Sequence, residues 1–219
     1  MTLPVWFGGT SDTTGDGARH SASAAARRLH LVRGDDTSPA VSTNPAHLAA
    51  LFAQARAGDF IAFERLFEVY YPSLLRFARR FVPSRDDAED VVQHVFTSLW
   101  LHRATISADA PPAPYLFGAV RNRALTHRKR FVRPQVTAAP SREAHDPSAA
   151  QTTAVTELRA TLDGAIVALP ERQRAALLLW WVEELNYADV GRALGVSAVA
   201  ARKLVVKALE RLRPLLDPS

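Results

Sequence analysis

Cysteine is absent from the 219 residues of this chain, and long apolar runs are absent too. The first absence excludes disulfides, thiolate zinc sites and cysteine nucleophiles. The longest apolar run, 175–182, has 8 residues, whereas a membrane-spanning helix needs about 18 or more. The N-terminus also lacks the basic start and apolar core of a secretory signal. We therefore expect a soluble protein that does not insert into a membrane.

The composition that is present suits a folded chain, with 47% hydrophobic residues, 22% charged residues and a formal net charge of +5. This content excludes a chain that is disordered throughout. Residues 1–47 are the exception, because Gly, Ser, Thr and Ala are frequent there and no hydrophobic period is sustained. We predict that 1–47 is a disordered N-terminal extension.

From residue 48 onward, hydrophobic residues recur at helical spacing and strand-like alternation does not occur. The pattern predicts a short helix over 48–56 that ends at Gly58, an aromatic-rich helix with a kink or break at Pro72, and a helix capped by Ser84. A proline-rich loop over 109–114 and a helix over 115–130 complete a first domain, 48–130. The aromatic-rich helix carries a predicted buried stripe of Phe60, Phe63, Phe67, Tyr70, Leu74, Phe77 and Phe81.

A second helical domain, 155–216, follows a proline-containing linker over 131–154. The sequence predicts helices over 155–169 and 172–182, a short helix capped by Asn186 and ended by Gly195, and a last helix capped by Ser197. The predicted fold class is therefore all-α, with two small helical domains whose relative placement stays open.

Basic residues gather in two separate segments. They outnumber acidic residues in 104–133 and in 186–219, whereas acidic residues are in excess in 82–103. Cations on two separate helices suggest two contacts with nucleic acid. The alternative is a solvated surface, because the helix dipole alone favours cations at the end of the helix over 115–130.

The most specific pattern lies in 186–212, where a short capped helix, a turn with glycine and a second capped helix follow one another. The second helix has one apolar stripe and basic residues on its other faces. This predicts a helix-turn-helix whose second helix enters the major groove of duplex DNA. Helix pairs of this kind also occur as simple packing units.

Motifs in both domains keep the order and spacing of one known family. The first domain contains Ala55-x-x-Gly58-Asp59-x-x-Ala62-Phe63, Asp87-Ala88-Glu89-Asp90-Val91-Val92-Gln93-x-Val95-Phe96-x-x-x-Trp100 and Tyr115-Leu116-x-x-x-Val120-Arg121-Asn122. The second contains Leu169-Pro170-x-Arg172-x-Arg174, Leu185-Asn186-Tyr187-x-Asp189-Val190-Gly191-x-x-Leu194-Gly195-Val196-Ser197 and Ala208-Leu209-Glu210-Arg211-Leu212-Arg213. On these motifs, 48–130 resembles region 2 and 155–216 resembles region 4 of the extracytoplasmic-function sigma factors of the sigma-70 family.

The resemblance implies a bacterial, cytoplasmic initiation subunit that binds core RNA polymerase and promoter DNA. Such a protein needs no cofactor or metal and is not an enzyme. The resemblance also implies docking on the β′ coiled coil and the β flap of polymerase, and control by an anti-sigma factor. The residues implied for the β′ contact are Asp87, Glu89, Asp90 and Gln93.

For promoter DNA, the resemblance implies one contact with each domain. Region 2 would capture the melted minus-ten strand through Trp100, Tyr115, Arg121, Asn122, Arg123, His127 and Arg128, because aromatic faces stack on unstacked bases and cations follow phosphates. Aromatic residues at this spacing are also typical of a helical core. Region 4 would read the minus-thirty-five element as a duplex through Ser197, Arg202, Lys203, Val206 and Lys207.

The sequence departs from the family pattern at two places and leaves two other functions open. His94 stands where the family commonly has Glu after Gln, and the segment 200–204 replaces the usual start of the recognition helix. One alternative is a helix-turn-helix regulator that acts without joining polymerase. The other is a helical adaptor whose basic faces are only solvated surface.

Overall fold

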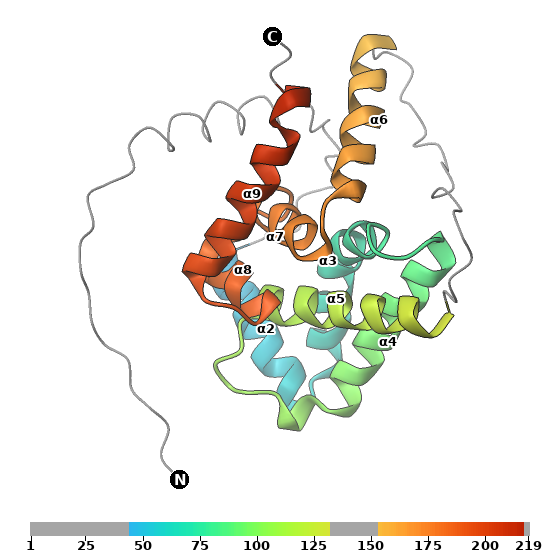
Figure 1. Ribbon diagram of the computed structural model, residues 1–219. Helices are drawn as coiled ribbons and strands as arrows, with labels where there is room; N and C mark the ends of the chain where they lie inside the picture. The colour runs from blue at the N-terminus through green and yellow to red at the C-terminus, as the bar shows by residue number, and fades with distance from the viewer. Residues whose placement is uncertain (1–43, 132–152, 217–219) are drawn as a thin grey trace, which may run out of the picture.

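The computed structural model describes residues 44–131 and 153–216, and Figure 1 shows the arrangement of their helices. Most of the predicted extension 1–47 and of the predicted linker 131–154 lies outside these ranges. The described residues form eight α-helices and one short 3-10 helix, with no strand among them. The predicted all-α class is confirmed. In these same ranges, no helix is long and apolar enough to cross a membrane.

The first two helices are α2 (Pro45–Ala57) and α3 (Phe60–Ala78), joined by a tight corner. Gly58 ends α2 as predicted, with a φ of 103°, a conformation that glycine adopts without strain. The side chain of Asp59 then caps α3 by accepting the backbone N–H groups of Ile61 and Ala62. Pro72 does not break α3, which continues through it with the proline exposed to solvent. Of the kink or break predicted at Pro72, the break is therefore wrong.

The predicted aromatic stripe of α3 is only half buried. Phe60 is 53% exposed, and the buried positions of the first turns belong to Ala62 and Leu66 instead. The reason is geometric, because a spacing of 3.5 residues drifts around a helix that has 3.6 residues per turn. The buried members of the stripe are Tyr70, Leu74 and Phe77 of α3, and Phe81, which lies beyond the end of α3.

Helices α4 (Arg85–Leu101) and α5 (Pro112–Phe131) complete the first domain, with a 3-10 turn, η1 (Arg103–Thr105), between them. The Ser84 cap is confirmed, since its hydroxyl oxygen accepts the Asp87 N–H at 3.0 Å. The predicted loop over 109–114 was partly wrong, because α5 begins inside it. Pro112 and Pro114 lie in the first turn of α5, where a helix needs no N–H donors.

The second domain consists of α6 (Thr153–Ala168), α7 (Glu171–Trp181), α8 (Tyr187–Leu194) and α9 (Ala198–Leu216). The predicted caps of α8 and α9 are confirmed: the Asn186 side chain accepts the Asp189 N–H at 2.9 Å, and Ser197 Oγ accepts the Ala200 N–H at 3.2 Å. The predicted inner face of α9 packs against α7 and α8, and its members are Ala201, Leu204, Val205, Ala208, Leu209 and Leu212.

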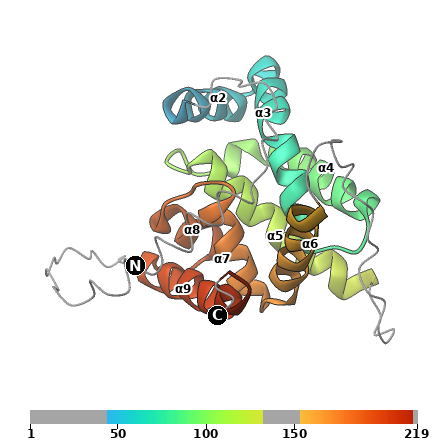
Figure 2. The same cartoon turned by 90° about the horizontal axis from the view of Figure 1, so that it is seen from above.

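The two domains are in contact with each other. Helix α5 packs against α4 of its own domain and against α8 of the second domain, as Figures 1 and 2 show. A Cβ atom placed on Gly118 of α5 would lie 2.8 Å from the backbone oxygen of Ala193 in α8. Only glycine permits this close approach of two helix backbones. Helix α5 is therefore covered on two sides.

Candidate nucleic-acid interface

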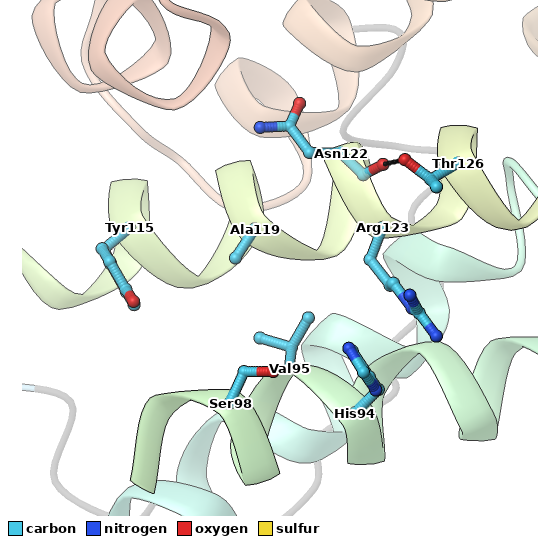
Figure 3. Close-up of a pocket in the computed structure, with 8 residues that line it drawn as sticks. All are labelled: His94, Val95, Ser98, Tyr115, Ala119, Asn122, Arg123 and Thr126. Carbon is cyan, nitrogen blue, oxygen red and sulfur yellow. Dashed lines mark hydrogen bonds between the residues drawn. The ribbon is translucent and has the colours of Figure 1, made fainter. Parts of the chain in front are cut away.

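An open cavity of about 280 Å³ lies between α4 and α5. Figure 3 shows Tyr115 and Arg123 pointing from α5 towards α4, with His94 facing Arg123 from the other wall. Aromatic, cationic and hydroxyl groups thus meet in a cavity of single-base scale, which is the chemistry that holds unstacked bases. The lining residues are His94, Val95, Ser98, Tyr115, Ala119, Asn122, Arg123 and Thr126.

The electrostatics of the cavity favour a ligand that accepts hydrogen bonds. Arg123 Nε is buried and has no hydrogen-bond partner among the described residues. Partial burial, followed by the nearby Arg123 cation, lowers the pKa of His94. Burial raises the pKa of the Tyr115 phenol, so the hydroxyl stays protonated at neutral pH. An oxygen-rich base edge or a phosphate would meet donors on both walls of the cavity.

Two of the predicted strand contacts, Tyr115 and Arg123, are therefore brought together, but their neighbours on α5 are not in the same place. Figure 3 shows the Asn122 side chain pointing away from α4, on the side of the second domain. Arg121 is only 7% exposed, and its Nε lies 2.6 Å from Glu171 Oε1 at the start of α7. In this arrangement Arg121 is not available to DNA, because the second domain covers it.

The remaining predicted strand contacts differ in exposure. Arg128 is exposed at the end of α5. The side chain of His127 is 11% exposed, and its Nε2 lies 3.4 Å from Asp87 Oδ1 on α4. His127 thus links the predicted strand helix to the predicted polymerase face, a role the sequence did not indicate.

Trp100 does not join the cavity. Its ring packs against Phe60 and Phe63 of α3, with centroid distances of 5.5 and 5.1 Å. The Arg103 guanidinium covers the ring at 4.5 Å. Since Trp100 and Ser98 lie on nearly opposite sides of α4, Trp100 faces α3 while Ser98 faces α5. The alternative left open by the sequence, a packing role, describes Trp100 in this arrangement.

The predicted polymerase-binding side chains of α4 fall into two groups, those that already have a partner and those that are exposed to solvent. Asp87 accepts the hydroxyl of its cap Ser84 at 2.7 Å, and Glu89 is paired with Arg85 at 2.8 Å. Asp90 and Gln93 are exposed. The exposed part of this acidic face therefore lies one to two turns into α4.

The outer face of α9 presents most of the predicted duplex contacts. Val206 is partly buried on the edge of this face, and Val199 in the first turn is 66% exposed. Val199 was missed by the sequence analysis, although its outward position in the first turn was readable from the helical period. The exposed predicted contacts are Ser197, Arg202, Lys203 and Lys207.

The cavity also contains residues that the sequence analysis did not propose for DNA, namely His94, Ser98 and Thr126. The one signal in the sequence that pointed to any of these three residues was His94, which stands where the family commonly has glutamate. The described residues contain no group of three or more His, Asp or Glu that could hold a metal ion.

Two family models match the chain. The model for sigma-70 region 2 matches residues 66–133, and the model for sigma-70 region 4 matches residues 165–214. Together they cover α4, α5 and the cavity, and the helix-turn-helix with its exposed cations.

Relatives of known name agree with this match. The chain is 30% identical to the ECF RNA polymerase sigma factor SigM of Mycobacterium tuberculosis over 169 residues, which is 77% of this chain and 84% of the relative. It is 32% identical to the RNA polymerase sigma factor CarQ of Myxococcus xanthus, over 74% of this chain and 92% of the relative. 

The fold is also that of a solved sigma factor. The sigma factor RpoE of Bartonella quintana, solved with the anti-sigma factor NepR, is similar with a TM-score of 0.59 and 22% identity, over 70% of this chain and 96% of that one. The family models, the named relatives and the all-α fold agree, and the chain belongs to the extracytoplasmic-function RNA polymerase sigma factors of the sigma-70 family.

Proposed function

We propose that this sigma factor holds the melted minus-ten strand with the α4–α5 cavity and reads the minus-thirty-five duplex with α9. The observation that carries the proposal is the cavity itself, where Tyr115 and Arg123 converge beside an unpartnered buried Nε. A base taken out of the stack needs an aromatic face and hydrogen-bond donors at its edge. The exposed cations of α9 suit phosphates and base edges of a duplex.

In this proposal, the exposed part of the acidic face of α4 binds polymerase. Asp90 and Gln93 are exposed there and are free to contact a basic helix of the β′ subunit, with Asp87 and Glu89 at its margin. The protein then acts in the bacterial cytoplasm as a binding subunit without catalysis of its own. The solved relative in complex with NepR supports an anti-sigma factor as a further partner of this chain.

The remaining strand contacts need a change in arrangement. Arg121 and Arg128 lie along α5 beside the cavity, and Asn122 lies at its margin. A strand that leaves the cavity along α5 would meet them once α5 is uncovered. His127 and Trp100 support the site by packing rather than by direct contact. A regulator that never joins polymerase is disfavoured, because it gives no function to the region 2 motifs or to the cavity.

Transcription from a library of promoters tests this proposal. Core polymerase with the full-length protein should give discrete 5′ ends that share an upstream and a downstream element. Arg123→Ala should lower the yield about 10-fold or more, since a charge-assisted base contact contributes about 1–3 kcal/mol. Arg79→Ala, at an exposed position at the end of α3, is the matched control. Core polymerase that gives the same 5′ ends without the protein would contradict the proposal.

A further inference from the structure

Val199 is a large hydrophobic side chain that is exposed at the start of α9. It lies in the first turn of the helix and is 66% exposed. The other large hydrophobic residues that are exposed within the described ranges belong to the first domain, namely Phe60, Ile61 and Leu101. A single exposed apolar residue is common on protein surfaces, so the surroundings of Val199 decide whether it has a function.

Val199 lies at the centre of the outward face of α9. At 3.6 residues per turn, Val206 projects within about 20° of Val199 around the helix axis. Arg202 projects about 60° to one side of Val199, and Lys203 projects about 40° to the other side. Both cations are exposed, whereas Ala201 on the opposite side of α9 is fully buried. A short apolar line therefore runs along α9 with a cation on each side.

The two cations favour a polyanion as the partner of this face. Arg202 and Lys203 are exposed, and neither forms an ion pair with another residue of the described ranges. A protein partner that buried Val199 would also have to desolvate two unpaired cations, which is costly unless each cation finds an acceptor. A DNA duplex supplies these acceptors as phosphates and guanine edges. Charge therefore favours duplex DNA over an apolar protein surface.

The chemistry of the major groove determines which base Val199 suits. Thymine is the base that presents an apolar group there, its C5 methyl, and apolar side chains pack on this methyl. Arginine and lysine instead pair with O6 and N7 of guanine or with phosphates. Val199, with Arg202 and Lys203 beside it, therefore fits a thymine that has guanines or phosphates as its neighbours.

Val199 and Val206 cannot contact the same base pair. Seven residues separate them, which is about 10 Å along the helix at about 1.5 Å per residue, whereas adjacent base pairs are about 3.4 Å apart. Val206 is half-buried, so Val199 offers the larger apolar surface to a ligand. One thymine position should therefore depend on Val199 alone.

We infer that Val199 is a specificity-determining residue that packs on the C5 methyl of one thymine in the minus-thirty-five element. The inference rests on the proposed use of α9 for reading that duplex. The two cations supply affinity and contacts to guanine, and the valine adds discrimination against a base that lacks the methyl. The thymine lies between the groups that Arg202 and Lys203 contact.

Removal of single methyl groups from the DNA tests the inference. In a promoter that the library recovers, each thymine of the minus-thirty-five element, on either strand, is replaced in turn by uracil, which keeps base pairing and lacks only the methyl. In competition binding, polymerase that carries the wild-type full-length protein should bind one of these promoters about fourfold more weakly, the effect of one buried methyl group. With Val199→Ala, the same replacement should have little effect, because the contacting side chain is already shortened.

Ile61→Ala is the matched control for Val199→Ala. Ile61 is 63% exposed and is the second residue of a capped helix, as Val199 is. Polymerase with Ile61→Ala should keep the full effect of the uracil replacement. The thermal unfolding midpoint of Val199→Ala should not fall, because the side chain is exposed and alanine favours a helix.

The uracil effect decides the inference in either direction. No uracil effect at any position, an equal effect in the wild type and in Val199→Ala, or an element without thymine would overturn it. Replacing Arg202 and Lys203 together by Ala separates this failure from a failure of the proposed function. If the double variant weakens promoter binding while no uracil effect depends on Val199, only the thymine contact is wrong. If the double variant also binds like the wild type, the proposed reading of the duplex by α9 fails.

Discussion

Helices α5 and α9 are both basic, yet they present their cations differently. On α9 the cations Arg202, Lys203 and Lys207 are exposed, whereas on α5 Arg121 is buried against Glu171. The difference follows from packing, because α9 lies on its own domain through one stripe while α5 is held between α4 and α8. A basic helix therefore becomes a DNA contact only where its neighbours leave the cations open, and for α5 that depends on the position of the second domain.

The largest effect should come from removing a core side chain of α5. Phe117 is 2% exposed and packs edge-to-face on Phe77 at 5.3 Å. Phe117→Ala should lower the free energy of unfolding by about 3–5 kcal/mol, because the cavity it leaves cannot collapse fully. Chemical denaturation measures this loss. Phe60 is 53% exposed, so Phe60→Ala should lower the free energy of unfolding much less. An equal loss in the two variants would show that α5 is not the central helix.

The next largest effect concerns the open helix α9. Replacing Arg202 and Lys203 together by Ala should weaken binding to a minus-thirty-five duplex by about 10-fold or more, since each base contact contributes about 1–3 kcal/mol. Binding of the full-length protein to the duplex, compared at two salt concentrations, separates base contacts from phosphate contacts. Arg213→Ala at the exposed end of α9 is the control. If the double variant binds like the control, the outer face of α9 is not the reading surface.

A third variant addresses polymerase without touching either basic helix. Asp90→Arg should weaken association with core polymerase, because it reverses a charge at the centre of the open acidic face. Asp90 is exposed, so the free energy of unfolding should change by no more than about 0.5 kcal/mol. Co-elution with core polymerase measures the first effect and denaturation the second. Glu64→Arg on α3 should leave both unchanged, and equal co-elution of the two variants would refute the assignment.

The smallest effect is a change in alkaline stability that reports on the domain contact. Burial, and secondarily Glu183 of the second domain, raises the pKa of Tyr70 on α3 to about 12. The unfolded chain ionises this phenol near pH 10. The stability that Tyr70 contributes is therefore present below pH 10 and is lost as the pH rises towards 12.

Tyr70→Phe should remove this alkaline loss, as measured by denaturation midpoints between pH 9 and about pH 11. Gly118→Ala places a Cβ 2.8 Å from Ala193 O and should disturb the domain contact, so the pKa of Tyr70 should move back towards its ordinary value. An unchanged ultraviolet titration of Tyr70 in that variant would show that Glu183 stays near α3.

The features that could be predicted from the sequence are those that depend on residues close together in the chain. The caps at Ser84, Asn186 and Ser197 and the turn at Gly58 depend on neighbours within a few residues, and each was confirmed. The inner stripe of α9 was also readable, because a helix that packs through one face keeps a simple period. The family motifs then indicated the function.

The contacts that could not be predicted from the sequence have tertiary causes. The burial of Arg121 depends on Glu171, which is 50 residues away along the chain, and no periodicity encodes that contact. The sequence left Trp100 between a DNA contact and a packing role, because its two aromatic partners lie on another helix, α3. Gly118 was the one sequence signal of the domain contact, because a glycine in the middle of a strong helical pattern often marks a close approach.

Site-specific crosslinking in the complete polymerase–promoter complex tests the central claim most directly. Photoreactive bases in the melted minus-ten strand should attach to α5 and the α4 wall of the cavity, between His94 and Arg128. Photoreactive bases in the minus-thirty-five duplex should attach to α9, between Ser197 and Lys207. Attachment of both elements to the same helix, or of the minus-ten strand to neither wall of the cavity, would contradict the assignment of the two elements to separate helices.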